Sequence, residues 1–207
     1  MEPLLPPPPR RTHSADLTTA TRILDEAERL TQTRGFNGFS YADIAAVVGT
    51  TKAALHYHFP SKADLGNALI ARYAERFFAA LDAIDASGAR GASASERLRR
   101  YIRLYADVLS QDRLCLCGML AAEYTTLPET MGQALRAFFS RNEGWLAGLL
   151  EAGRRAGTLR FDGPPEESAR ALTATLEGAM LLARAHGDPR HFDATAAYLT
   201  RELTAAA

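Results

Sequence analysis

The sequence predicts an all-α protein of about nine helices, in which a three-helix domain with a helix-turn-helix is joined by a long helix to a larger helical domain. Apolar residues recur at steps of three and four along almost the whole chain, and Gly, Pro and capping residues interrupt them at intervals typical of helix ends. No segment alternates apolar and polar residues as a half-buried strand does.

The composition fits a globular protein, because 47% of its 207 residues are apolar and can form a sizeable core. No uncharged apolar stretch is long enough to span a membrane, and the N-terminus lacks the apolar middle of a signal peptide. We therefore expect a cytoplasmic protein without a membrane partner. The net charge is zero, so any nucleic-acid binding must depend on the local arrangement of residues.

Residues 1–15 are rich in proline, and we expect them to form a disordered tail before a helix-turn-helix domain at 16–61. Ser40 with Asp43 resembles a capping box, and Gly49 stands where that short helix ends. The next helix stops before Pro60, because the residue before a proline disfavours α geometry. The first four helices are expected at 17–34, 41–48, 52–58 and 62–86.

The rest of the chain, 62–207, is expected to form the second domain, with a small-residue segment at 88–95 as another candidate boundary. Glycines and prolines divide the remaining apolar pattern. They predict helices at 95–110, 112–126, 129–156, 165–186 and 190–204.

The second and third helices have the spacing of a helix-turn-helix. Ala45 and Gly49 allow a close crossing and a tight bend, while Leu55 and Phe59 form the inward stripe. The opposite face carries donors and aromatic groups that suit base edges and phosphates in a major groove. The candidate DNA-binding residues are Ser40, Tyr41, Thr50, Thr51, Lys52, Ala53, His56, Tyr57, His58 and Lys62.

The stretches FSYADIA, from Phe39, and GTTKAALHYHFPSK, from Gly49, closely resemble the DNA-binding motif of the TetR family of repressors. The resemblance implies an N-terminal DNA-binding domain and a C-terminal domain for ligand binding and dimerisation. It implies a homodimer without cofactor or enzymatic activity, released from a palindromic double-stranded DNA operator by a small-molecule effector. His56 departs from the tyrosine frequent in the family, so no base preference carries over at that position.

Two pairs of these residues, Ser40 with Tyr41 and His56 with His58, suggest a second role. Ser40 and Tyr41 either contact phosphate through a helix N-terminus or only cap the helix. His56 and His58 stand two residues apart and point to different faces, so they do not form a metal pair.

The segment CLCGMLAAEY, from Cys115, resembles a subgroup of the family whose regulators respond to reactive or acyl-type small molecules. Ligand sites are mostly apolar with a few polar groups, although aromatic residues at helical spacing are more often plain core and acids are more often exposed. The candidate ligand-binding residues are Tyr101, Tyr105, Cys115, Cys117, Met119, Glu123, Tyr124, Phe138, Trp145 and Glu177.

Cys115 and Cys117 are too close in sequence for an ordinary structural disulfide, so we expect reduced thiols. A helix N-terminus with Arg113 nearby favours a reactive thiolate, whereas apolar neighbours oppose one, and the sequence does not rank these effects. The alternatives to a ligand-responsive repressor are a thiol-dependent enzyme, a sensor that binds metal through the two thiols and a histidine, and an activator.

Dimerisation is expected in the last two helices, at 165–186 and 190–204, which would form a four-helix bundle with their mates. Small residues that permit a close approach there are Ala171, Ala174, Gly178 and Ala185.

Overall fold

The computed structural model describes residues 13–204, with side chains from Thr18 onward. In this range the chain forms nine α helices and one short 3-10 helix, and its only strand-like pairing is a bridge between Leu159 and Thr204. The predicted all-α class is therefore confirmed. The first helix already starts at His13, so residues 13–15 were wrongly placed in the tail, and the remainder of the predicted tail lies outside the described residues.

The helices are α1 (His13–Arg34), α2 (Tyr41–Val48), α3 (Lys52–His58), α4 (Lys62–Ala89), α5 (Ala94–Leu109), α6 (Leu116–Ala122), α7 (Glu129–Arg155), α8 (Pro165–His186) and α9 (Arg190–Leu203). The helix expected at 112–126 is wrong in its first part. Asp112 has a φ of +55°, which a continuing helix does not allow, so α6 begins only at Leu116. A 3-10 turn, Tyr124–Thr126, follows it.

Local caps explain why α2 and α3 are short. The backbone N–H of Ser40 donates to the Asp43 carboxylate at 2.7 Å, which starts α2, and Gly49 ends it in the left-handed region at a φ of +69°. The Thr51 hydroxyl accepts from the N–H of Ala54 at 3.2 Å and caps α3. Phe59, just before Pro60, is already in an extended conformation.

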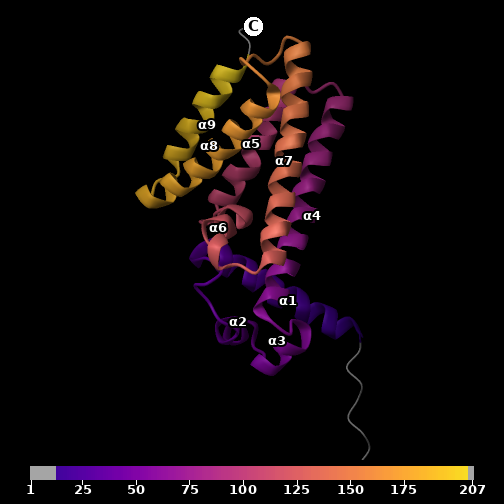
Figure 1. Ribbon diagram of the computed structural model, residues 1–207, viewed down its shortest axis with the longest axis vertical. Helices are drawn as coiled ribbons and strands as arrows, with labels where there is room; N and C mark the ends of the chain where they lie inside the picture. The colour runs from indigo at the N-terminus through magenta and orange to yellow at the C-terminus, as the bar shows by residue number, and fades with distance from the viewer. Residues whose placement is uncertain (1–12, 205–207) are drawn as a thin grey trace, which may run out of the picture.

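Figure 1 shows α1, α2 and α3 gathered at one end of the molecule, with the long helices α4 and α7 side by side above them. Helices α8 and α9 pack against each other on the other side of the upper body. The segment 88–95 is not a domain boundary, because α4 and α5 on either side of it pack together and bury Leu81, Ile84 and Leu98. None of the described helices is long and apolar enough to cross a membrane.

Candidate functional site

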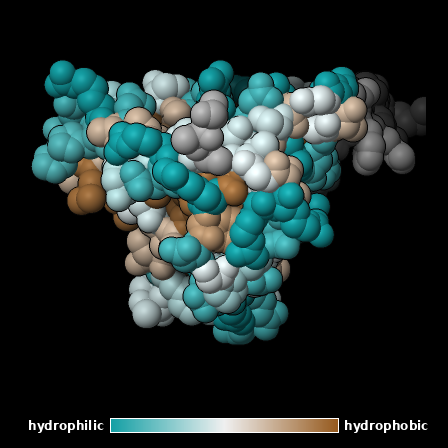
Figure 2. Space-filling view, turned by 90° about the horizontal axis from the view of Figure 1, so that it is seen from above, coloured by the Kyte–Doolittle hydropathy of each residue, from teal (hydrophilic) through white to brown (hydrophobic). Residues whose placement is uncertain are grey.

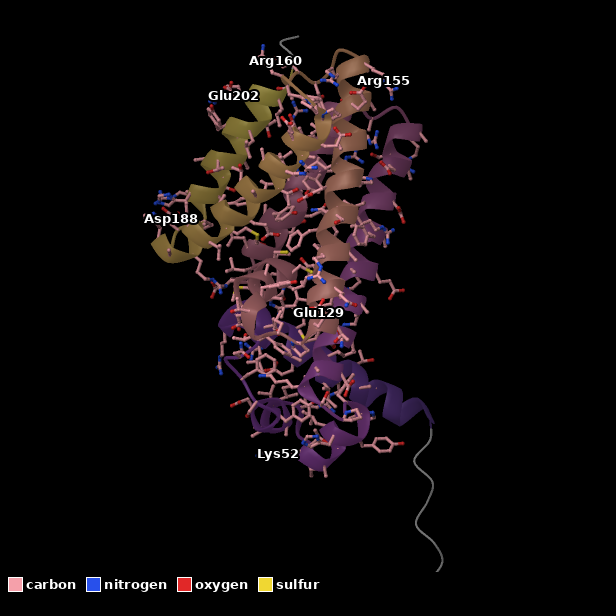
Figure 3. The ribbon with its side chains drawn as sticks, viewed as in Figure 1. Lys52, Glu129, Arg155, Arg160, Asp188 and Glu202 are labelled. Carbon is pink, nitrogen blue, oxygen red and sulfur yellow. The ribbon has the colours of Figure 1, made fainter. Side chains whose placement is uncertain are left out.

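Helix α3 presents a polar face at the tip of the molecule remote from the C-terminal helices. Lys52, at its first position, lies at the lower end in Figure 3 and is exposed. Tyr57 is 74% exposed, which is unusual for so large a side chain, whereas Leu55 on the opposite face is fully buried. The helix is thus anchored by one side and offers the other to a partner.

The other residues predicted to bind DNA surround this face. Thr51, Ala53 and His56 are exposed, Thr50 and His58 are half-buried, and Ser40 is exposed at the start of α2. The His56 ring lies 4.8 Å from the Tyr41 ring, and its Nδ1 is 3.1 Å from the Pro60 carbonyl oxygen. This orientation leaves the second ring nitrogen of His56 for an external group.

Two of the residues predicted to contact DNA have hydrogen-bond partners inside the helix-turn-helix. The Tyr41 hydroxyl donates to the carbonyls of Phe59 at 2.8 Å and Ser61 at 2.7 Å, and burial raises the pKa of this side chain to about 12. The Lys62 ammonium donates to the Phe39 carbonyl at 2.5 Å and lies over the Phe39 ring at 4.5 Å. Burial lowers the pKa of Lys62, and both side chains stabilise the helix-turn-helix through these internal contacts.

A polar cluster lies inside the C-terminal helices. The hydroxyls of Tyr101 and Tyr105, one turn apart on α5, are 3.1 Å apart. The Asn142 amide on α7 donates to Tyr101 at 3.0 Å and to Tyr105 at 3.3 Å. Burial raises the pKa of Tyr101 to about 12, while its hydrogen bonds to Tyr105 and Asn142 and the nearby Thr173 hydroxyl oppose that rise.

Glu177 extends this cluster one turn along α8 from Thr173. Burial raises the pKa of its carboxyl group to about 7, and a hydrogen bond with the Cys115 thiol acts in the opposite direction. The Tyr73 hydroxyl on α4 lies 3.5 Å from the Cys115 sulfur. Helices α4, α5, α6, α7 and α8 therefore all contribute to one buried polar region or its edge.

The structure ranks the two opposing effects on the thiols. Cys115 and Cys117 are almost completely buried, and desolvation, with a further contribution from Glu177, raises the pKa of both thiols well above the usual value. The effect of the helix N-terminus is outweighed, so neither thiol is a reactive thiolate in this conformation. No three residues of the types that ligate metal come together in the described part of the chain.

Three oxygens of the cluster are shielded from solvent and have no partner in the described structure: Asn142 Oδ1, Thr173 Oγ1 and Glu177 Oε1. Buried polar atoms are nearly always hydrogen-bonded, so each unpaired one calls for an explanation. Neither Asn142 nor Thr173 was predicted from the sequence. The position of Asn142 could have indicated its burial. It stands four residues after Phe138 and four before Leu146, on an otherwise apolar, buried stripe of α7.

The remaining predicted ligand residues divide into two groups. Tyr101, Tyr105, Phe138 and Trp145 belong to the aromatic interior, where the Trp145 ring stacks on Tyr101 at 5.5 Å. Met119 is half-buried against the same core. Tyr124 lies outside the cluster, 41% exposed, with its hydroxyl bonded by Arg136.

Glu123 lies outside the buried polar cluster and contacts the helix-turn-helix. Its carboxylate accepts from the backbone N–H of Phe36 at 2.8 Å and of Asn37 at 3.2 Å, in the turn between α1 and α2. Arg184 on α8 makes a second connection of this kind, donating to the carbonyls of Gln32 and Thr33 at 3.2 Å each. These two side chains tie the C-terminal helices to the helix-turn-helix.

The helix-turn-helix with an exposed α3, carried on a larger helical body, matches two family models. Residues 23–69 match the bacterial regulatory proteins of the tetR family, and residues 94–199 match the tetracyclin repressor-like C-terminal domain. This chain belongs to the TetR family. TetR-family proteins are DNA-binding transcriptional regulators, typically repressors whose C-terminal domain binds a ligand, so the chain is a regulator and not an enzyme.

Curated relatives and solved structures agree with this assignment. The chain is 29% identical over 188 residues to the transcriptional regulator AcuR of Cereibacter sphaeroides, covering 88% of this chain and 84% of AcuR. It is 30% identical over 122 residues to the regulator RutR of Escherichia coli, covering 59% and 57%. A TetR-family regulator from Agrobacterium tumefaciens is 36% identical and superimposes with a TM-score of 0.86 over 92% of this chain and 100% of that one.

Proposed function

We propose that this regulator is a homodimeric repressor that binds a palindromic operator through α3 of each subunit and releases it when a small molecule binds among the C-terminal helices. The observation that carries the proposal is the exposed polar face of α3, held by the buried Leu55 at the end of the molecule opposite the C-terminal bundle. We divide the chain accordingly into a DNA-binding domain at 16–61 and a regulatory domain at 62–207.

The DNA contacts that this geometry supports come from one face of α3 and its N-terminal cap. Lys52 is placed to neutralise a phosphate, and Tyr57 with the free edge of His56 is placed to reach base or sugar edges. Thr51 and Ala53 are at the N-terminal end, which in helix-turn-helix proteins approaches the groove first. Ser40, Thr50 and His58 lie at the margin of this surface.

The outward face of α8 and α9 supports dimerisation. Leu181, Leu182 and Tyr198 are 50%, 60% and 54% exposed, which leaves large apolar side chains in contact with solvent. Figure 2, seen from above, shows hydrophobic surface at its left edge, the side on which α8 and α9 lie in Figure 1. The small residues Ala171, Ala174 and Ala185 are also exposed on α8, so a second copy can approach closely.

The contacts of Glu123 and Arg184 provide the connection between effector and operator. A palindrome fixes the separation of the two α3 helices, so a small displacement of each helix-turn-helix is enough to lose simultaneous binding. Because α6 and α8 hold the end of α1 and its following turn directly, a ligand that moves either helix moves the DNA-binding domain.

Selection of bound DNA from random fragments tests this proposal, and we expect a palindrome to be recovered. Lys52→Ala should then weaken binding and lower the log-log salt slope by about one per subunit, because one phosphate contact per subunit is lost. Arg155→Ala, at the far end of α7 in Figure 3, is the matched control and should change neither quantity. Recovery of non-palindromic sites, or an unchanged slope for Lys52→Ala, would contradict the proposal.

A further inference from the structure

We propose that the effector of this regulator is a small primary amine, bound in its ammonium form by an acceptor triad that consists of Asn142, Thr173 and Glu177. The inference rests on the proposed function, because it identifies the chemistry of the ligand that the regulatory domain binds. It concerns the buried polar cluster described above.

The triad consists of oxygens that lack donors. Asn142 is completely buried and Thr173 is 3% exposed, and the unpaired oxygens of all three side chains are shielded from water. A buried polar atom without a partner is energetically unfavourable, and three in one cluster are a substantial unfavourable contribution. A ligand that donates to them removes this cost, which favours its binding.

The three side chains all lie near one group, the Tyr101 hydroxyl. Asn142 donates to the Tyr101 hydroxyl at 3.0 Å, and Thr173 lies close enough to that same hydroxyl to oppose the rise in the pKa of Tyr101 that burial causes. Glu177 follows Thr173 by four residues on α8, which places both side chains on one face about 5–6 Å apart. The three side chains thus approach Tyr101 from α7 and α8.

The unpaired oxygens of the triad require hydrogen-bond donors. An amide oxygen and an ionised carboxylate only accept hydrogen bonds, whereas a primary ammonium group carries three N–H donors and no acceptor. No donor of the cluster reaches Asn142 Oδ1 or Glu177 Oε1, while the Asn142 amide donates to the Tyr101 and Tyr105 hydroxyls and these two hydroxyls bond to each other. A ligand that offers only acceptors can accept from the Thr173 hydroxyl but leaves the Asn142 and Glu177 oxygens without a donor.

Charge distinguishes an amine from a neutral donor such as an alcohol. The groups that interact with Glu177 are tyrosines and thiols, and no Lys, Arg or His forms an ion pair with it in the described structure. A buried carboxylate without a cation is strongly disfavoured, and a bound ammonium supplies the missing charge.

The walls of the cluster suit the rest of such a molecule. The Trp145 ring stacks on Tyr101 at 5.5 Å, and Phe77 lies edge-on to Tyr105 at 6.4 Å and stacked with Tyr73 at 6.3 Å. Aromatic faces attract cations and accommodate methylene groups, so a short alkyl amine fits the surroundings on both counts.

Binding at the triad also explains how an effector would act. The cluster is closed in this structure, so a ligand enters only if a neighbouring helix moves. Gly118 of α6 lies directly against the Glu177 carboxylate, at a distance that leaves no space for a side chain at position 118. The other end of α6 is continuous with Glu123, which holds the turn after α1, so displacement of α6 acts on the DNA-binding domain.

The test is calorimetric titration of the full-length dimer with straight-chain primary amines from methylamine to pentylamine, and with the matching alcohols and carboxylic acids. We expect saturable binding of at least one amine, one site per subunit, at least tenfold tighter than the alcohol or acid of the same length. The same amine should release operator DNA. Glu177→Gln should weaken amine binding at least tenfold and Thr173→Val by a smaller factor, whereas the exposed Glu75→Gln should have no effect.

Failure to bind any amine of the series, tighter binding of acids or alcohols, or unchanged affinity in Glu177→Gln would each overturn the inference. Operator affinity in the absence of ligand shows whether each variant is folded, and Glu177→Asp, which keeps the charge, should bind amine more tightly than Glu177→Gln. Operator release by some other class of molecule would sink the amine assignment but leave the proposed function intact. Loss of palindrome binding itself would contradict the proposed function independently of the calorimetry.

Discussion

Replacing Glu177 with glutamine should make the stability of this protein less sensitive to pH. Burial raises the pKa of this carboxyl group from its usual 4.5 to about 7 in the folded state. Between these values the folded chain holds a proton that the unfolded chain has released, so the free energy of unfolding falls as the pH rises. Above about pH 7 the folded protein carries an ionised carboxylate whose Oε1 is shielded from solvent and unpaired.

The size of the effect follows from the same interval. At 1.36 kcal/mol per pH unit, a pKa that moves from 4.5 to about 7 corresponds to about 3 kcal/mol per chain at pH 8, and to nothing below about pH 4. Glutamine has nearly the same shape and never ionises. We therefore expect Glu177→Gln to be more stable than wild type by about 2–3 kcal/mol at pH 8, with a difference that shrinks towards pH 4.5.

Urea denaturation of both proteins at several pH values, at one fixed protein concentration, measures this difference. The exposed Glu75→Gln serves as the control, and its stability should follow that of wild type at every pH. A stability gain for Glu177→Gln that is the same at pH 5 and pH 8 would show that ionisation of this group is not the cause, and the argument would be refuted.

Three further predictions concern the operator contact, the two thiols and the dimer interface. Tyr57→Ala should lose about 1–3 kcal/mol of operator binding at unchanged Tm, because this side chain is 74% exposed; a lowered Tm would count against a direct contact. Cys115 and Cys117 should react with a thiol-specific disulfide reagent far more slowly in the native than in the unfolded protein, and the double serine variant should still respond to effector, unless covalent sensing operates. Leu182→Glu should shift sedimentation from dimer to monomer, and an intact dimer would remove this face of α8 from the interface.

Sequence reasoning located the helices well where their ends are set by nearby residues. The capping boxes at Ser40 and Ser61 and the left-handed Gly49 are local features, so α2, α3 and the start of α4 were confirmed. The start of α6 was missed because the turn before it depends on a distant contact. Arg184 donates to the carbonyl of Asp112 at 2.7 Å from 72 residues away, where Asp112 has a conformation that residues other than glycine rarely adopt.

The same distinction explains the site. Exposure of α3 follows from its own apolar spacing, so Lys52 and Tyr57 were placed on the correct face. Lys62 and Glu123 look like free charged residues in the sequence, yet their partners are the Phe39 carbonyl and the Phe36 N–H, 23 and 87 residues away. A charged side chain that bonds to a distant backbone group produces no periodic pattern in the sequence, so only the folded structure reveals the contact.

The position of the short helix α6 depends mainly on the contacts made at its two ends. It has seven residues, and an isolated helix of this length is unstable in water, so tertiary contacts determine where it lies. Cys115 at its N-terminal side meets Tyr73 and the Glu177 carboxyl, and Glu123 at its C-terminal side holds the turn after α1. The long helix α4, by contrast, packs against both α1 and α7 and is fixed along its length. We therefore expect a ligand at Glu177 to change the position of α6 before that of α4, and Glu123 to transmit that change to the helix-turn-helix. An effector can shift the equilibrium only by its difference in affinity for the two positions of α6, so the packing of Gly118 against Glu177 sets how strongly ligand and operator oppose each other.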